Sequence, residues 1–195
     1  MPKKAITESD VIDIDSYIKD RDSIKKKIKE HKNNRRVHVG PHATFYFESF
    51  DTMLYQVQEM LYIERGGREQ LQDELKAYNP LIPDGSNLKC TQMIEFPDEE
   101  ERKVKLTELV DVENRTYIQI QGFDRVYAIA DEDLERANSE KTSSVHFSRF
   151  EFTADMVAAI KNGAAMAMGS DHPNYNYRVD EIDPETQGTL IDDFA

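Results

Sequence analysis

Residues 116–130 read TYIQIQGFDRVYAIA, and this stretch decides the fold class. Two runs rich in β-branched and aromatic residues, 116–121 and 125–130, flank the short connection Gly122-Phe123-Asp124. Runs of this composition around a short connection that contains glycine are typical of a β-hairpin. The stretch therefore predicts two antiparallel strands.

Outside this hairpin, short extended segments are mixed with helices. Alternating apolar residues predict strands at 36–49, with a break at Gly40-Pro41, and at 89–96 and 144–153. Helical spacing, acidic starts and glycine stops predict helices at 15–33, 50–65, 68–78, 97–109, 131–138 and 154–162. The segment 173–195 is acidic, and we expect it to form a loop-like tail.

Hairpins mixed with helices of different lengths, without strict β-α-β alternation, indicate the α+β class. The length of 195 residues suits one domain. We therefore expect a single domain with a largely antiparallel sheet, flanking helices and an N-terminal basic helix. Neither GxGxxG nor GxxxxGK[ST] occurs, so the sequence indicates no nucleotide cofactor.

The charge is unevenly distributed along the chain. The chain has 38 acidic and 25 basic residues, a net charge of −13, whereas residues 1–36 hold 11 basic and 7 acidic residues. Eight of the basic residues lie between Arg21 and Arg36. This run is a solvated helix face, a clamp on another part of the same acidic chain, or a docking surface for an acidic partner. The acidic remainder, which lacks basic-aromatic alternation, argues against nucleic acid as a partner.

The sequence also bears on location. It contains no apolar run of about 18 residues, the length that spans a bilayer. The start, MPKKAITESD, lacks the apolar stretch of a secretory signal. Cys90 is the only cysteine, so an internal disulfide is excluded. We expect a cytoplasmic protein that does not enter a membrane.

Histidines and one helical carboxylate suggest a metal site. His38 and His42 flank the Gly40-Pro41 corner, and His146 lies on a predicted strand with aromatic neighbours. An inward carboxylate such as Glu59, on the helix 50–65, is the kind of group that builds carboxylate-metal sites. Imidazole and carboxylate ligands suit iron, zinc or manganese. The hypothesis is a divalent-metal site of His38, His42, Glu59 and His146; a structural hydrogen-bonding role for each histidine is the simpler alternative.

Three further side chains are candidates for acid–base work or anion binding: Glu48, Tyr55 and Lys141. Glu48 shares a predicted face with His42, and Tyr55 begins a polar-aromatic stripe on its helix. Lys141 lies in a loop just before the strand of His146. The alternative for all three is an ordinary solvated or ion-paired side chain.

Several long segments resemble the bacterial domain-of-unknown-function 3501 family. They are Arg35-Arg36-Val37 running into Gly40-Pro41-His42, Tyr55–Met60, Tyr78–Gly85, Ala128–Asp133, Glu140–Phe147 and Asp171–Tyr175. The resemblance covers roughly residues 10–194 and implies one domain. It supplies no catalytic residues. It implies a genetic context instead, because family members are often encoded beside rubrerythrin-like and iron–sulfur reductase-like proteins.

Three functional hypotheses follow, and they leave open whether the protein is an enzyme. The first is a non-haem metal-binding protein linked to redox or oxidative-stress work. The second is a non-catalytic accessory protein that docks a rubrerythrin-like or iron–sulfur reductase partner through its basic helix. The third is a small-molecule enzyme that uses His and Glu as base and acid without a metal. Homo-oligomer formation is compatible with each of them.

Overall fold

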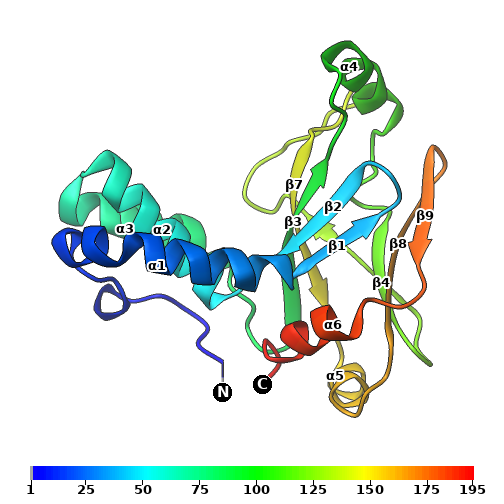
Figure 1. The fold of residues 1–195 in the computed structure, drawn as a ribbon. Coiled ribbons are helices and arrows are strands. Elements are labelled where there is room, and N and C mark those ends of the chain that lie inside the picture. The colour runs from blue at the N-terminus through cyan, green and yellow to red at the C-terminus, as the bar shows by residue number, and fades with distance from the viewer. Residues whose placement is uncertain (1) are drawn as a thin grey trace.

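The computed structural model describes residues 2–195. Within this range the chain forms a single α+β domain with six α-helices and two antiparallel sheets (Figure 1). The predicted fold class is confirmed, with two sheets where the sequence suggested one. No helix in this range combines the length and the apolar character needed to cross a membrane.

The larger sheet, sheet A, has the strand order β1-β2-β3-β7-β6, and each neighbouring pair is antiparallel. Its strands are β1 (Arg36–Val39), β2 (Ala43–Phe47), β3 (Asn87–Ile94), β7 (Val145–Glu151) and β6 (Ile129–Ala130). Gly40 makes the β1–β2 turn with a φ of +67°, and a Cβ there would lie 2.6 Å from the Tyr177 ring. The turn therefore requires glycine.

The smaller sheet, sheet B, has the order β5-β4-β8-β9. Its strands are β5 (Arg125–Tyr127), β4 (Thr116–Ile120), β8 (Met166–His172) and β9 (Tyr175–Val179). The predicted hairpin is confirmed as β4–β5. The second predicted strand divides at Ala128, however, because β5 pairs with β4 whereas β6 pairs with β7 of the other sheet. One extended segment thus links the two sheets.

The main core lies between the two sheets. Sheet A contributes fully buried side chains such as Phe45, Leu88 and Phe150, and sheet B contributes Ile118 and Met166. Helices α5 (Ala154–Lys161) and α6 (Pro184–Ile191) add Ile160 and Leu190 to the same core. We call the two sheets with α5 and α6 the β-sandwich.

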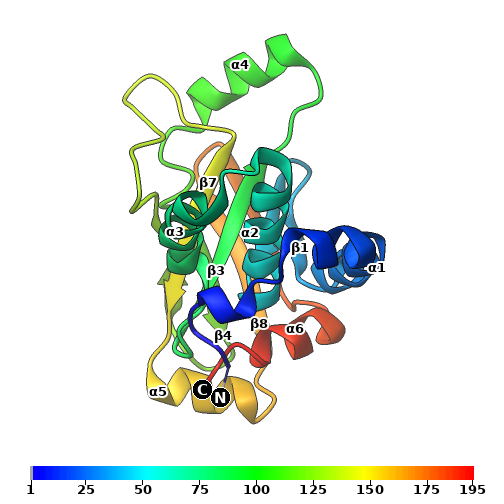
Figure 2. The same cartoon turned by 90° about the vertical axis from the view of Figure 1, so that its left-hand side faces the viewer.

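Three helices project to one side of the β-sandwich: α1 (Ile14–Asn33), α2 (Phe50–Glu64) and α3 (Gly67–Tyr78). Figure 2 shows α2 between the other two. A second apolar cluster, which includes Met53, Val57 and Leu61 of α2, lies here and also buries Ile6 of the N-terminal segment. We call α1, α2, α3 and residues 2–13 the helical lobe.

Helix ends follow the local chemistry that the sequence shows. Ser49 and Thr52 exchange side chain-to-backbone hydrogen bonds and begin α2, and Arg65 ends it in a left-handed conformation, with a φ of +55°. Helix α4 (Glu99–Glu108), at the far end of the molecule in Figure 1, is capped by Asp98. The predicted start at Pro97 therefore lies just outside the helix.

Two predictions of secondary structure are wrong. Residues 131–138 form an irregular loop and no helix. Their acidic side chains do not cap a helix, because Asp131 binds His146 outside the loop and Asp133 binds Arg136 within it. The segment 173–195 is not a loop-like tail, since it forms β9 and α6. Buried Tyr175 and Leu190 anchor these elements, and Asp183 caps α6 next to Pro184.

Candidate binding groove

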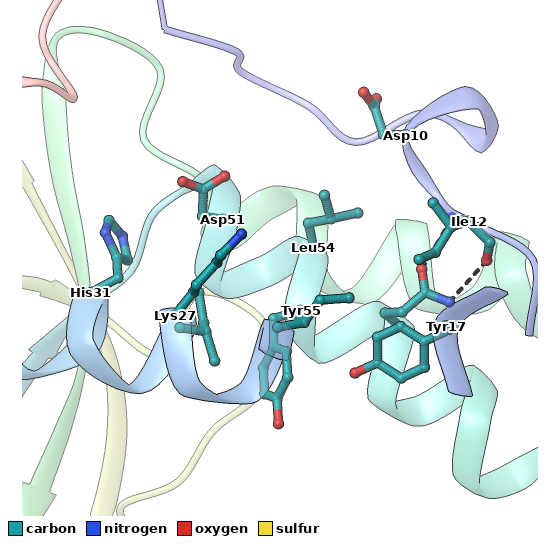
Figure 3. Close-up of a pocket in the computed structure, with 11 residues that line it drawn as sticks. Asp10, Ile12, Tyr17, Lys27, His31, Asp51, Leu54 and Tyr55 are labelled. Atoms are coloured by element: carbon teal, nitrogen blue, oxygen red, sulfur yellow. Dashed lines mark hydrogen bonds between the residues drawn. The ribbon is translucent and has the colours of Figure 1, made fainter. Parts of the chain in front are cut away.

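A cavity of about 400 Å³ lies between α1 and α2 (Figure 3). Sites for small molecules and cofactors commonly have this size and are mainly apolar. Eleven residues line the cavity: Asp10, Ile12, Tyr17, Ile24, Lys27, Ile28, His31, Asp51, Leu54, Tyr55 and Gln58. We call it the α1–α2 groove.

Each helix contributes one stripe of side chains to the groove. The spacing is i, i+3, i+4 and i+7 on both helices, with positions 24, 27, 28 and 31 on α1 and 51, 54, 55 and 58 on α2. Residues at this spacing share one face over two turns, so the groove runs about 10 Å along the helices. Ile24, Ile28 and Leu54 make its middle apolar.

A polar clasp fastens the two helices at one end of the groove. The Tyr17 hydroxyl donates to Glu59, and Arg21 donates to the same carboxylate from Nε and Nη2, each at 2.8 Å. The Arg21 hydrogen bonds hold the pKa of Glu59 below its ordinary value. Burial, and then Glu59, raise the pKa of Tyr17. Glu59, predicted as a metal ligand, thus links α1 to α2.

The opposite end of the groove is also polar. Figure 3 shows Lys27, His31 and Asp51 together there. A ring nitrogen of His31 lies 2.9 Å from the hydroxyl of Ser49, which caps α2. Burial, and then the charge of Arg35, lower the pKa of His31. The two helices therefore run antiparallel, with a hydrogen-bonded contact at each end and an open apolar stretch between.

The N-terminal segment closes one side of the groove. The Gln58 amide accepts from the backbone nitrogen of Ile12 at 3.1 Å and donates to its carbonyl at 3.0 Å. Asp10 pairs with Lys3, and hydrogen bonds from Lys3 and Thr7 lower the pKa of Asp10 to about 2. These contacts hold the segment beside α2.

Part of the basic run of α1 is exposed to solvent, and Lys27 of this run lines the groove. Four lysines, at positions 25, 26, 27 and 29, are exposed, and none of them forms an ion pair within residues 2–195. Within the predicted basic run, Arg21 and Arg35 pair with Glu59 and Asp193 of the same chain, whereas these four lysines face solvent. They are available to an outside acidic group.

The structure places His38 and His42 near the same residue, Glu95. His38 Nδ1 lies 3.0 Å from the hydroxyl of Thr44, which donates to the Glu95 carboxylate at 2.5 Å. His42 Nδ1 lies 3.1 Å from the backbone carbonyl of Glu95, and its ring stacks on Phe96. Both histidines thus make local contacts at one end of sheet A.

His146 is fully buried in a different environment. Its Nδ1 lies 2.6 Å from the carboxylate of Asp131, and its Nε2 lies 2.9 Å from the Thr142 hydroxyl and 3.0 Å from the Ser143 carbonyl. Thr142 in turn donates to buried Glu113 at 3.1 Å. The ring ties the loop after β6 to the start of β7.

The structure does not bring the four predicted metal ligands together. Glu59 binds Arg21, His146 binds Asp131, and the other two histidines contact Thr44 and Glu95. Among the described residues, no three His, Cys, Asp or Glu side chains gather so that they could hold a metal ion. Metal binding stays a prediction, which elemental analysis of protein purified without a His tag would test.

Of the three other candidates, only Tyr55 lines the groove. Burial, and then Glu59, raise its pKa. Glu48 accepts from the hydroxyls of Thr52 and Thr91, at 2.7 and 2.8 Å. Lys141 is exposed in the loop before β7. The groove also includes Lys27, Asp51 and Leu54, which are not among the predicted site residues. The sequence signal that points to them is the matching helical spacing of the lining positions on α1 and α2.

Comparison with known proteins places the chain in a family. The family model described as "Protein of unknown function (DUF3501)" matches residues 5–194. The chain belongs to the DUF3501 family. It is also similar to a crystal structure of a novel protein of unknown function from Burkholderia pseudomallei, with 42% identity and a TM-score of 0.92, over 98% of this chain and 100% of that one. No curated protein matches the chain.

Proposed function

We propose that this DUF3501 protein is a non-catalytic accessory protein whose α1–α2 groove binds an acidic amphipathic helix of a partner protein. The observation that carries the proposal is an open apolar groove lined by Lys27, which has no ion-pair partner within residues 2–195 and lies on the same helix as three further exposed lysines. Apolar lining supplies affinity, and the unpaired charges select the sign of the partner.

The shape of the groove favours a helix as the occupant. Two antiparallel helices expose matching stripes over two turns, so a third helix can lie along them with apolar side chains at i, i+3 or i+4 and i+7. Those side chains would contact Ile24, Ile28 and Leu54. This arrangement buries apolar surface that the free protein leaves partly in water.

The charge around the groove favours an acidic occupant. Lys25, Lys26 and Lys29 lie on the same helix as Lys27, which lines the groove itself. A carboxylate on the partner helix would pair with Lys27, and the other three lysines would attract an acidic partner and repel a basic one at longer range. Asp51, beside Lys27, favours one basic residue of the partner at that end, which would set the direction of binding.

The genetic context implied by the family resemblance suggests which class of protein is the partner. Rubrerythrin-like and iron–sulfur reductase-like proteins carry their own redox centres. An accessory protein beside them requires no metal ligands of its own. The proposal therefore pairs the DUF3501 protein with such a redox protein and assigns it a docking role.

A binding titration with the neighbouring rubrerythrin-like or reductase-like protein tests the proposal. Replacing Lys25, Lys26, Lys27 and Lys29 together by Glu should abolish binding. The single change Lys27→Glu should weaken it, and the matched change Lys76→Glu, at an exposed lysine of α3, should leave it unchanged. Raising the salt concentration should weaken the wild-type complex.

Circular dichroism and thermal melting of each variant show that the fold is retained. If the folded quadruple variant binds as tightly as the wild type, or if Lys76→Glu weakens binding as much as Lys27→Glu does, the groove is not the docking site.

A further inference from the structure

A second cavity, of about 260 Å³, lies on the outer face of sheet A, away from the α1–α2 groove. Its lining is mainly apolar, with Leu81, Ile129 and Phe147, and the Ile129 side chain is 41% exposed at its edge. The cavity also contains the partly buried side chain of Lys89. An amine thus borders an apolar pocket that is open to solvent.

Strand register places Lys89 next to another cation. Lys89 on β3 lies directly opposite Arg149 on β7, and Arg149 lies opposite Ile129 on β6. Side chains directly opposite in an antiparallel pair are close neighbours, and like charges there are unfavourable. The pairing therefore disfavours a second full positive charge beside Arg149.

Arg149 forms ion pairs with the nearby carboxylates. Its Nε and Nη2 donate to Glu132, each at 2.8 Å, and its Nη1 donates to Glu151. Lys89 forms no ion pair within residues 2–195; its amine donates instead to the neutral carbonyl of Pro80 at 2.6 Å. A neutral amine can donate the same hydrogen bond, so this contact does not require a charged Lys89.

These surroundings act on the protonation of the amine. Burial lowers the pKa of Lys89, and Arg149 lowers it further, against the opposing charges of Asp84, Glu151 and Glu132. A lysine that is desolvated and placed beside a cation has a larger unprotonated fraction at neutral pH, and only that form is nucleophilic.

We infer that Lys89 is a reactive amine that forms an imine with a small apolar aldehyde or ketone bound in this cavity. The Lys89 nitrogen attacks the carbonyl carbon and forms the C–N bond of a carbinolamine. One amine proton passes to the carbonyl oxygen, and the second leaves with that oxygen as water when the C–O bond breaks. The products are one imine and one water, with no change of oxidation state.

Reductive trapping tests this inference on the whole protein. The folded protein is incubated with hexanal and cyanoborohydride at neutral pH, which converts an imine into a stable secondary amine, and labelled lysines are mapped by peptide mass spectrometry. Lys89 should be labelled several-fold faster than Lys25 and Lys26, the exposed internal references. Equal or slower labelling of Lys89 would overturn the inference.

Two variants separate the cavity from the electrostatics. Ile129→Ser removes apolar lining at an exposed position and should slow labelling of Lys89 by hexanal, while labelling by formaldehyde, which has no apolar chain, stays unchanged. Arg149→Gln should slow both reactions because it removes the neighbouring cation. If neither variant changes the rate at Lys89, the cavity and the cation do not activate it, and the inference fails.

Discussion

The β-sandwich and the helical lobe are built from similar apolar residues but bury them to different extents. Between the sheets, Phe45, Ile118 and Phe150 are fully buried. In the lobe, Ile18 is 45% exposed and Ile24 and Leu54 line an open groove. The difference indicates that the β-sandwich supplies most of the stability and that the lobe retains apolar surface for recognition.

A single buried arginine connects the two regions. Arg35, between α1 and β1, donates to the carbonyls of Phe47, Glu48 and Thr189, and pairs with Asp193 near the C-terminus. The C-terminal segment after α6 is thereby fastened to the base of the lobe. This contact joins residues that are 158 positions apart in the sequence.

The largest expected effect tests whether stability resides in the β-sandwich. Phe150→Ala should lower the free energy of unfolding by about 3–5 kcal/mol because it leaves a cavity in a fully packed core. Leu54→Ala, in the groove, should cost about 1 kcal/mol or less. Urea titrations of both variants measure the difference. Equal losses would show that the groove is as tightly packed as the core.

The next effect concerns the connection between the two regions and depends on pH. Burial raises the pKa of Asp193 to about 6 although Arg35 opposes the shift, so the folded state holds this proton more tightly than the unfolded chain does. The contribution of this group to stability is therefore full below about pH 4 and decreases as the pH rises through about 6.

Asp193→Asn removes this titration. Relative to the wild type, the variant should gain stability between about pH 4 and about pH 7, on the order of 1–3 kcal/mol. Denaturant titrations across that range measure the gain. A wild-type-to-variant difference that does not change with pH contradicts the raised pKa.

The smallest effect concerns the clasp of the lobe. Arg21 lowers the pKa of Glu59, so this carboxylate contributes stability above its ordinary pKa and loses it as the pH falls through the lowered value. Glu59→Gln should cost no more than about 1 kcal/mol at neutral pH, because the clasp is partly solvated. The difference from the wild type should shrink under acidic conditions.

Glu69→Gln is the matched control, since its exposed carboxylate forms no ion pair in the described part of the chain. Its stability should stay within about 0.5 kcal/mol of the wild type. A cost for Glu59→Gln that persists undiminished in acid would show that packing, not charge, holds the clasp.

The elements predicted correctly are those with local causes. The helix 15–33 and the helix 50–65 follow from apolar spacing and caps, and the β4–β5 hairpin follows from its glycine connection. The predicted helix at 131–138 is wrong because an acidic start is also compatible with a loop whose carboxylates bind distant residues, as Asp131 binds His146. The predicted loop-like tail at 173–195 is wrong because the few apolar residues of this acidic segment, Tyr175 and Leu190 among them, are buried against the rest of the fold.

The candidate site was predicted only in part for the same reason. Helical spacing predicted the helices 15–33 and 50–65, which carry Ile24, Ile28 and Leu54, and charge counting identified the lysine run. That the apolar faces of these helices diverge and leave a groove depends on how α1 and α2 are clasped. Among the described residues, the structure places the four predicted ligands in separate hydrogen-bonded contacts, and helical or strand spacing alone does not determine such positions.

The sequence by itself determined the α+β class, most helix boundaries and the positive surface of α1, because propensity, capping and charge act over a few residues. Only the tertiary structure decided that the strands divide into two sheets at Ala128, that the chain end returns to Arg35, and that Lys89 lies beside Arg149. Those features depend on register and packing between segments far apart in the chain, which no local pattern encodes.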